Sequence, residues 1–95
     1  MSTTYSILSS LFQISKNIKR KKNLMNNEDK KDLSENFINL INDLLSSTGQ
    51  TNDEKFVILS FLTLNENIIE WSLSKCTKKN KECYNNFKYN FINNK

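Results

Sequence analysis

The sequence contains no histidine and only one glycine, and these two absences remove most catalytic and cofactor-binding options. Without imidazole, a single chain cannot form a Ser-His or Cys-His pair or a His-metal site. One glycine is too few for the glycine-rich phosphate loops of nucleotide-binding proteins. The carboxylates fall at expected helix starts or on polar helix faces, which is the spacing of solvated charge. We therefore expect a protein that is not an enzyme, with no cofactor and no metal site.

Long apolar runs are absent as well. No window reaches the roughly 18 apolar residues of a membrane span, and no basic segment precedes an apolar one as in a secretory signal. The only two cysteines, Cys76 and Cys83, lie seven positions apart. On one continuous helix this spacing is a rise of about 10 Å, which is beyond disulfide reach. Two free thiols indicate a reducing compartment, so we predict a cytoplasmic protein.

Acidic residues are missing from the first 27 positions, which carry all of the excess positive charge. Residues 1–27 contain five basic and no acidic residues, whereas residues 28–95 contain nine basic and ten acidic residues. The formal net charges of the two parts are therefore +5 and −1. The five bases fall within the tract KNIKRKK. We call them the basic collar: Lys16, Lys19, Arg20, Lys21 and Lys22. On a helical wheel they point in nearly every direction, as bases around a helix end would.

Proline is absent too, and apolar residues recur with a helical period along the chain. Their spacing predicts four helices, at about residues 4–21, 28–47, 52–75 and 79–92. In the first helix one apolar stripe is formed by Ile7, Leu11, Ile14 and Ile18. Asn27 is the predicted N-cap of the second helix, and Gly49 is its predicted left-handed stop.

The third helix has the clearest local signal. Thr51 and Glu54 have the spacing of a capping box, in which each side chain accepts a hydrogen bond from the backbone of the other. The apolar residues that follow cover most of the helix circumference. A helix of this kind must be covered on several sides, so we predict that residues 52–75 form the central helix of the fold.

The segment after Thr77 is ambiguous. Tyr84, Phe87 and Phe91 share a helical face, but Phe87, Tyr89 and Phe91 also alternate as in a strand. No other segment offers a strand to pair with, so we favour a short fourth helix. Lysines at its start place positive charge where the helix dipole prefers negative charge. The alternative is a kinked continuation of the third helix.

Loops of only a few residues favour antiparallel neighbours. We predict an all-α fold, a small antiparallel up-down four-helix bundle made by one domain over residues 1–95. The alternative is a three-helix bundle with a docked C-terminal tail.

Two residue types have both a structural and a functional interpretation. Neighbouring lysines would favour the thiolate of Cys76 and Cys83, but we prefer two small half-buried apolar side chains. Trp71 could anchor an interface, but its register with Val57 and Leu64 favours a place in the core.

Four interpretations of the basic collar compete. In the structural one, the five bases form the last helical turn and pair with Glu28, Asp29 or Asp32 across the loop. In the second, they bind nucleic acid together with a second basic and aromatic patch. That patch consists of Lys78, Lys79, Lys81, Tyr84, Lys88 and Tyr89. The third is a mitochondrial presequence or an interfacial membrane helix, although presequences use Arg more than Lys and removal would strip apolar surface from the bundle.

The fourth interpretation is a protein partner with an acidic surface, which we favour over nucleic acid. The hypothesis is a non-catalytic helical protein of the inhibitor, immunity, phage or viral modulator, or adaptor kind, with the basic collar as its contact surface. A nucleic-acid-binding accessory role is the alternative. A homodimer is left open, and a membrane is not expected to be a partner.

Overall fold

The computed structural model describes residues 3–93, and these residues form five α-helices and no strand. The helices are α1 (Thr3–Lys21), α2 (Asn27–Ser46), α3 (Asn52–Leu64), α4 (Glu66–Lys75) and α5 (Lys78–Asn93). The all-α prediction is therefore confirmed. The predicted count of four helices is wrong, because the expected third helix is divided into α3 and α4.

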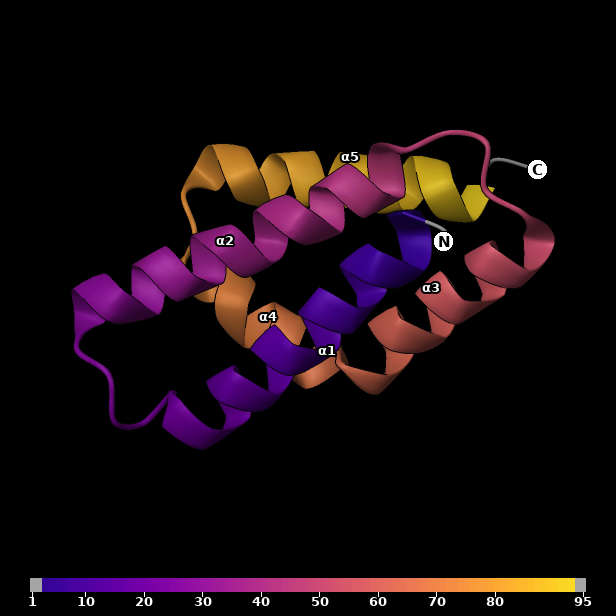
Figure 1. Ribbon diagram of the computed structural model, residues 1–95. Coiled ribbons are helices and arrows are strands. Elements are labelled where there is room, and N and C mark those ends of the chain that lie inside the picture. Colours follow the sequence, from indigo (N-terminus) through magenta and orange to yellow (C-terminus); the bar gives the residue numbers. More distant parts are fainter. Residues whose placement is uncertain (1–2, 94–95) are drawn as a thin grey trace.

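Helices α1 and α2 form an antiparallel pair joined by a short turn (Figure 1). The N-cap of α2 is Asn26 and not Asn27, since the Asn26 side chain accepts a hydrogen bond from the Asp29 backbone at 2.8 Å. Glu28 and Asp29 occupy the first turn of α2, where the helix dipole favours negative charge. Our predicted start of this helix was one residue late.

The capping box at the start of α3 is confirmed. The Glu54 backbone N–H donates to the Thr51 hydroxyl at 3.1 Å, and the Thr51 N–H donates to the Glu54 carboxylate at 2.7 Å. Gly49 has the expected positive φ of 79°, but it does not stop α2. The helix already ends at Ser46, because Ser47 is extended. Gly49 instead turns the chain within the loop toward α3.

Asn65 separates α3 from α4. Its backbone N–H donates to the Phe61 carbonyl at 3.0 Å, and its side-chain amide donates to the same carbonyl at 2.9 Å. Its side-chain oxygen accepts from the Ser15 hydroxyl of α1 at 2.5 Å. The next helix begins from the Asn65 carbonyl, which accepts from Ile69 at 2.9 Å. Asn65 is thus buried with its side chain satisfied at the corner.

The central helix is α2, not the predicted third helix. It packs against α1, α4 and α5, and Figure 1 shows α5 running along it in the same direction. Helix α3 packs mainly on α1 and α4, and its Phe61 ring also lies 6.3 Å from the Phe37 ring of α2, but one of its sides faces solvent. The break at Asn65 explains the difference, because the apolar stripes expected on one helix are distributed over two helices with different directions.

The buried apolar side chains form one cluster to which all five helices contribute. Its members are Leu8, Leu11, Ile18, Phe37, Ile38, Ile41, Leu44, Leu45, Ile58, Phe61, Leu62, Ile68, Ile69 and Tyr84. Ser34 and Ser72 are fully buried in α2 and α4. Small side chains let helix axes approach closely, which suits the tight packing between these two helices.

Helix α5 confirms the preference for a separate C-terminal helix, and its start depends on α2. The Asn80 backbone N–H donates to the Thr77 hydroxyl at 3.3 Å, so Thr77 acts as the N-cap. The Glu35 carboxylate of α2 accepts from the Thr77 backbone N–H at 2.9 Å and from the Asn80 side-chain amide. This carboxylate supplies the negative charge that the lysine-rich first turn of α5 lacks.

Candidate functional site

The basic collar surrounds the C-terminal end of α1. Lys16, Lys19, Arg20 and Lys21 are exposed, and Lys22 is half-buried just beyond the helix. The bases of the last turn are favourably placed against the negative end of the helix dipole. Ile18, in the same turn, is fully buried in the core. The collar is therefore carried by a helix end that is fixed to the rest of the fold.

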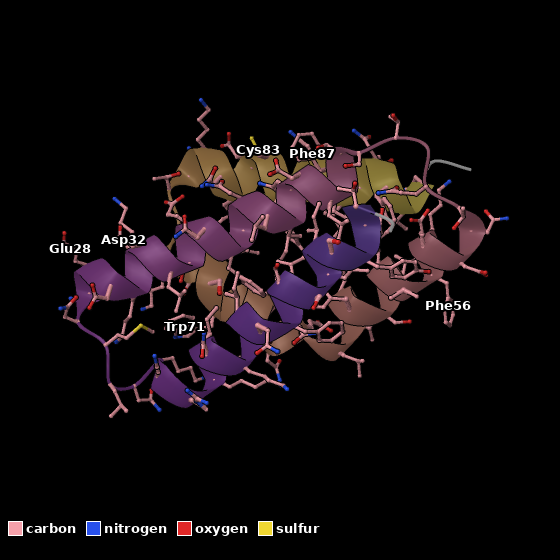
Figure 2. The ribbon with its side chains drawn as sticks, in the orientation of Figure 1. Glu28, Asp32, Phe56, Trp71, Cys83 and Phe87 are labelled. Atoms are coloured by element: carbon pink, nitrogen blue, oxygen red, sulfur yellow. The ribbon has the colours of Figure 1, made fainter. Side chains whose placement is uncertain are left out.

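The expected pairing of the collar across the loop does not occur. Among residues 3–93, no ion pair joins the collar to Glu28, Asp29 or Asp32. Figure 2 shows Glu28 and Asp32 projecting from the side of α2 that faces away from the end of α1. Glu28 and Asp29 instead lie in the first turn of α2, where the helix dipole favours negative charge. The positive charge of the collar is left without a neutralising group inside the described chain.

The second basic and aromatic patch lies on α5 and is only partly brought together. Lys78, Lys79 and Lys81 are exposed in its first turn, and Tyr89 is 67% exposed further along. Tyr84, in contrast, is only 4% exposed, so its ring is not accessible for stacking on a nucleic-acid base.

Tyr84 belongs to the core between α4 and α5. Burial, followed by the charges of Glu66 and Glu70, raises the pKa of the Tyr84 phenol to about 12. The ammonium of Lys88 lies 5.8 Å from the centre of the Tyr84 ring, within the range of a cation–π contact. Lys88 thus covers a buried ring and does not extend the exposed lysine group.

The cysteines are free and half-buried, as expected of small apolar side chains. Cys76 ends α4 and Cys83 lies on α5. Burial raises the pKa of the Cys76 thiol to about 11, with a further increase from Glu35 that outweighs the opposing effect of Lys81. At neutral pH Cys76 is therefore a protonated thiol: Lys81 favours the thiolate, as the sequence suggested for neighbouring lysines, but burial and Glu35 outweigh it.

Trp71 is half-buried and packs against the core cluster from α4. The Lys75 ammonium lies 5.7 Å from the centre of its ring. Figure 2 places Trp71 near the crossing of α4 and α1, away from Phe56. The expected core role is thus met in part, since one portion of the side chain stays accessible.

An uncharged surface on α1 and α3 lies outside the charged patches that the sequence predicts as contact surfaces. Phe56 and Leu64 are 71% and 74% exposed, and Figure 2 shows Phe56 projecting from α3 away from the other helices. The sequence did contain a signal, because residues 3–15 and 56–65 have no charged side chain. In one central helix over residues 52–75, as predicted, the apolar side chains of 56–65 would be buried; the break at Asn65 leaves part of them exposed.

The described residues also contain a surface cavity of about 370 Å³ where α2 ends. It is lined by the loop from Ser46 to Gln50, by Lys55, and by Phe87, Asn90 and Phe91 of α5. Among residues 3–93, no group of three or more His, Cys, Asp or Glu side chains is placed to hold a metal ion. No helix in this part of the chain has the length and apolar character needed to cross a bilayer.

Comparison with known proteins gives no match for this chain, whether with protein-family models, with curated proteins or with solved structures. The interpretation of the site therefore depends on its own geometry.

Proposed function

We propose that this chain is a small non-catalytic protein that acts by binding another protein through the basic collar. The observation that supports the proposal is the exposure of Lys16, Lys19, Arg20 and Lys21 with no ion pair among the described residues. An acidic surface on a partner would supply the missing neutralising charge. Exposed charge of one sign also accelerates the encounter with an oppositely charged partner.

The rigidity of the collar favours specific binding. Leu11 and Ile18 of α1 are fully buried, so the backbone that carries the bases is already ordered before binding. Ordering a flexible segment would otherwise reduce the affinity. The two free cysteines support a cytoplasmic location as part of the same proposal.

The experiment is a pull-down from the native host with quantitative mass spectrometry, using the wild type and two charge-matched variants. The collar variant replaces its five bases with Gln. The control replaces five lysines elsewhere with Gln: Lys31, Lys55, Lys78, Lys79 and Lys81. A protein that is retained by the wild type and the control, but lost from the collar variant, supports the proposal. Equal loss from both variants contradicts it, since total charge alone would then explain retention.

Nucleic acid is the second candidate. Exposed lysines at the start of α5 and the exposed ring of Tyr89 favour it, whereas the burial of Tyr84 removes one stacking ring. A gel-shift titration on random DNA and RNA at two salt concentrations separates the candidates. A steeply salt-dependent shift favours nucleic acid, because binding would release phosphate counterions. Absence of a shift at low salt eliminates this candidate.

A further inference from the structure

Two neighbouring helical segments carry no charge, although a quarter of the chain is charged. The first segment is residues 3–15 of α1. The second is residues 56–65, which comprise most of α3 and the corner residue Asn65. The rings of Phe12 and Phe61 lie 4.9 Å apart in an edge-to-face contact, which places the two helices side by side. The uncharged segments therefore join into one surface that spans both helices.

The two helices run in the same direction. Phe12 contacts Phe61. Three residues further along α1, Ser15 forms a hydrogen bond with Asn65, which is four residues after Phe61. The two sequences thus advance together, as Figure 1 also shows. The start of α3 is level with the start of α1, and the collar extends beyond the end of α3.

Large apolar side chains are exposed on this surface. We call it the neutral face: Tyr5, Phe12, Phe56 and Leu64. Isolated exposed apolar residues are normal, but a group of four on two adjoining helices with no intervening charge indicates an interaction surface. Removing this area from water favours association in proportion to the apolar surface buried.

The neutral face is bordered by opposite charges at its two ends. On α1, Lys16 follows Tyr5 and Phe12 at positions i+11 and i+4, so the three share one helical stripe. On α3, Asp53 lies three residues before Phe56 on the exposed side. Lys16 is exposed at one end of the face, and Asp53 is exposed at the other.

We propose that the neutral face binds a second copy of this chain in a two-fold symmetric dimer. In such a dimer the same patch lies on both subunits. The two-fold axis lies in the plane of the interface, passes midway between Lys16 and Asp53, and is perpendicular to the line that joins them. Rotation about this axis places Lys16 of each copy opposite Asp53 of the other copy. The second copy matches uncharged surface with uncharged surface and gives two Lys16–Asp53 pairs. An acidic protein, in contrast, would gain no charge complementarity on the neutral face.

The dimer does not depend on the proposed role of the collar. Lys19, Arg20, Lys21 and Lys22 lie beyond Lys16 and stay accessible to an acidic partner. The neutral face is about 20 Å long, and its width is that of two adjacent helices, about 20 Å. Its footprint is below the roughly 800 Å² that each partner buries in a standard stable interface. We therefore expect a weak dimer whose population rises with protein concentration.

The test is sedimentation equilibrium of the full chain from about 1 µM to about 1 mM. The wild-type mass should rise from the 11.2 kDa of one chain toward twice that value. Phe56→Glu should raise the dissociation constant by about 10- to 100-fold. Because Phe56 is mostly exposed, this change leaves the core intact, which circular dichroism verifies. Tyr89→Glu on α5 is the matched control and should dimerise as the wild type does, since Tyr89 is exposed to a similar extent.

A charge exchange tests the position of the axis. Lys16→Glu and Asp53→Lys should each weaken the dimer by about five-fold, and the double variant should return to within about two-fold of the wild type. A wild type that stays monomeric at every concentration overturns the proposal. So does a Phe56→Glu protein that dimerises like the wild type, or a double variant that is no tighter than the single ones.

Discussion

The hydrogen bond between Ser15 and Asn65 allows a quantitative test of how the fold is held at the corner between α3 and α4. The Ser15 hydroxyl donates to the Asn65 side-chain oxygen at 2.5 Å, and both residues are buried. Ser15→Ala removes the donor and leaves a buried acceptor without a partner. An orphaned buried polar group costs about 1–3 kcal/mol. The higher helix propensity of Ala returns only a few tenths of a kcal/mol.

The expected loss is large enough to measure by thermal unfolding followed by circular dichroism. For a chain of this size, each kcal/mol shifts the melting temperature by about 4–8 °C. Ser15→Ala should therefore lower it by roughly 4–20 °C. Ser10→Ala is the matched control, because Ser10 is exposed on the same helix and the change has the same intrinsic effect on helix propensity.

A double-mutant cycle isolates the interaction itself. Asn65→Ala should destabilise the protein, since it also removes the side-chain bond to the Phe61 carbonyl. With Asn65 absent, Ser15→Ala should cost less, by a coupling energy of about 0.5–3 kcal/mol. Strict additivity, or an equal effect of Ser15→Ala and Ser10→Ala, would show that this bond does not stabilise the corner.

Three further outcomes follow from single contacts. Glu35→Gln removes the charged acceptor of the Thr77 N–H. It should lower the free energy of unfolding by about 1–2 kcal/mol and speed amide hydrogen exchange in α5. Unchanged exchange in α5 would contradict this role of Glu35. Thr51→Ala should cost about 1 kcal/mol in urea denaturation through loss of the N-cap bond, and an unchanged midpoint would refute the cap. In a Cys83→Ser background, Cys76 at pH 8 should react with iodoacetamide about 100-fold more slowly in the folded than in the unfolded chain. The reason is that its pKa rises from 9.0 to about 11, and the thiolate is the reactive form; equal rates would refute the raised pKa.

Features set by neighbouring residues could be predicted from the sequence. The capping box of Thr51 and Glu54 needs only a spacing of three, and both of its hydrogen bonds form. Amphipathic periods likewise located α1 and α2 to within one residue at each end. The all-α class followed from the same helical period up to about residue 75 and, for the C-terminal segment, from the lack of another strand with which it could pair.

Features set by distant residues could not be predicted. Nothing in residues 52–75 interrupts the helical pattern, and the corner at Asn65 is stabilised by Ser15, 50 positions away. The start of α5 similarly needs Glu35, 42 positions before Thr77. A continuous helix over residues 52–75 would be central and covered on several sides, whereas the corner at Asn65 leaves one side of α3 exposed.

The candidate site shows the same division between local and distant information. The position of the basic collar at the end of α1 follows from the sequence period alone. Whether its bases pair with Glu28, Asp29 or Asp32 depends on which way α2 presents its first turn, and that direction is set by the packing of α2 on α4 and α5. The unpaired state of the collar in the described chain is therefore a result of tertiary structure.

The most direct test of the proposed function is zero-length carbodiimide cross-linking in a lysate of the native host, which joins a lysine amine to a carboxylate in contact with it. The account predicts cross-links from Lys19, Lys21 and Lys22 to acidic peptides of another protein, with few from the exposed lysines at the start of α5. Cross-links that arise mainly from Lys78, Lys79 and Lys81, or none from the collar to another protein, would contradict it.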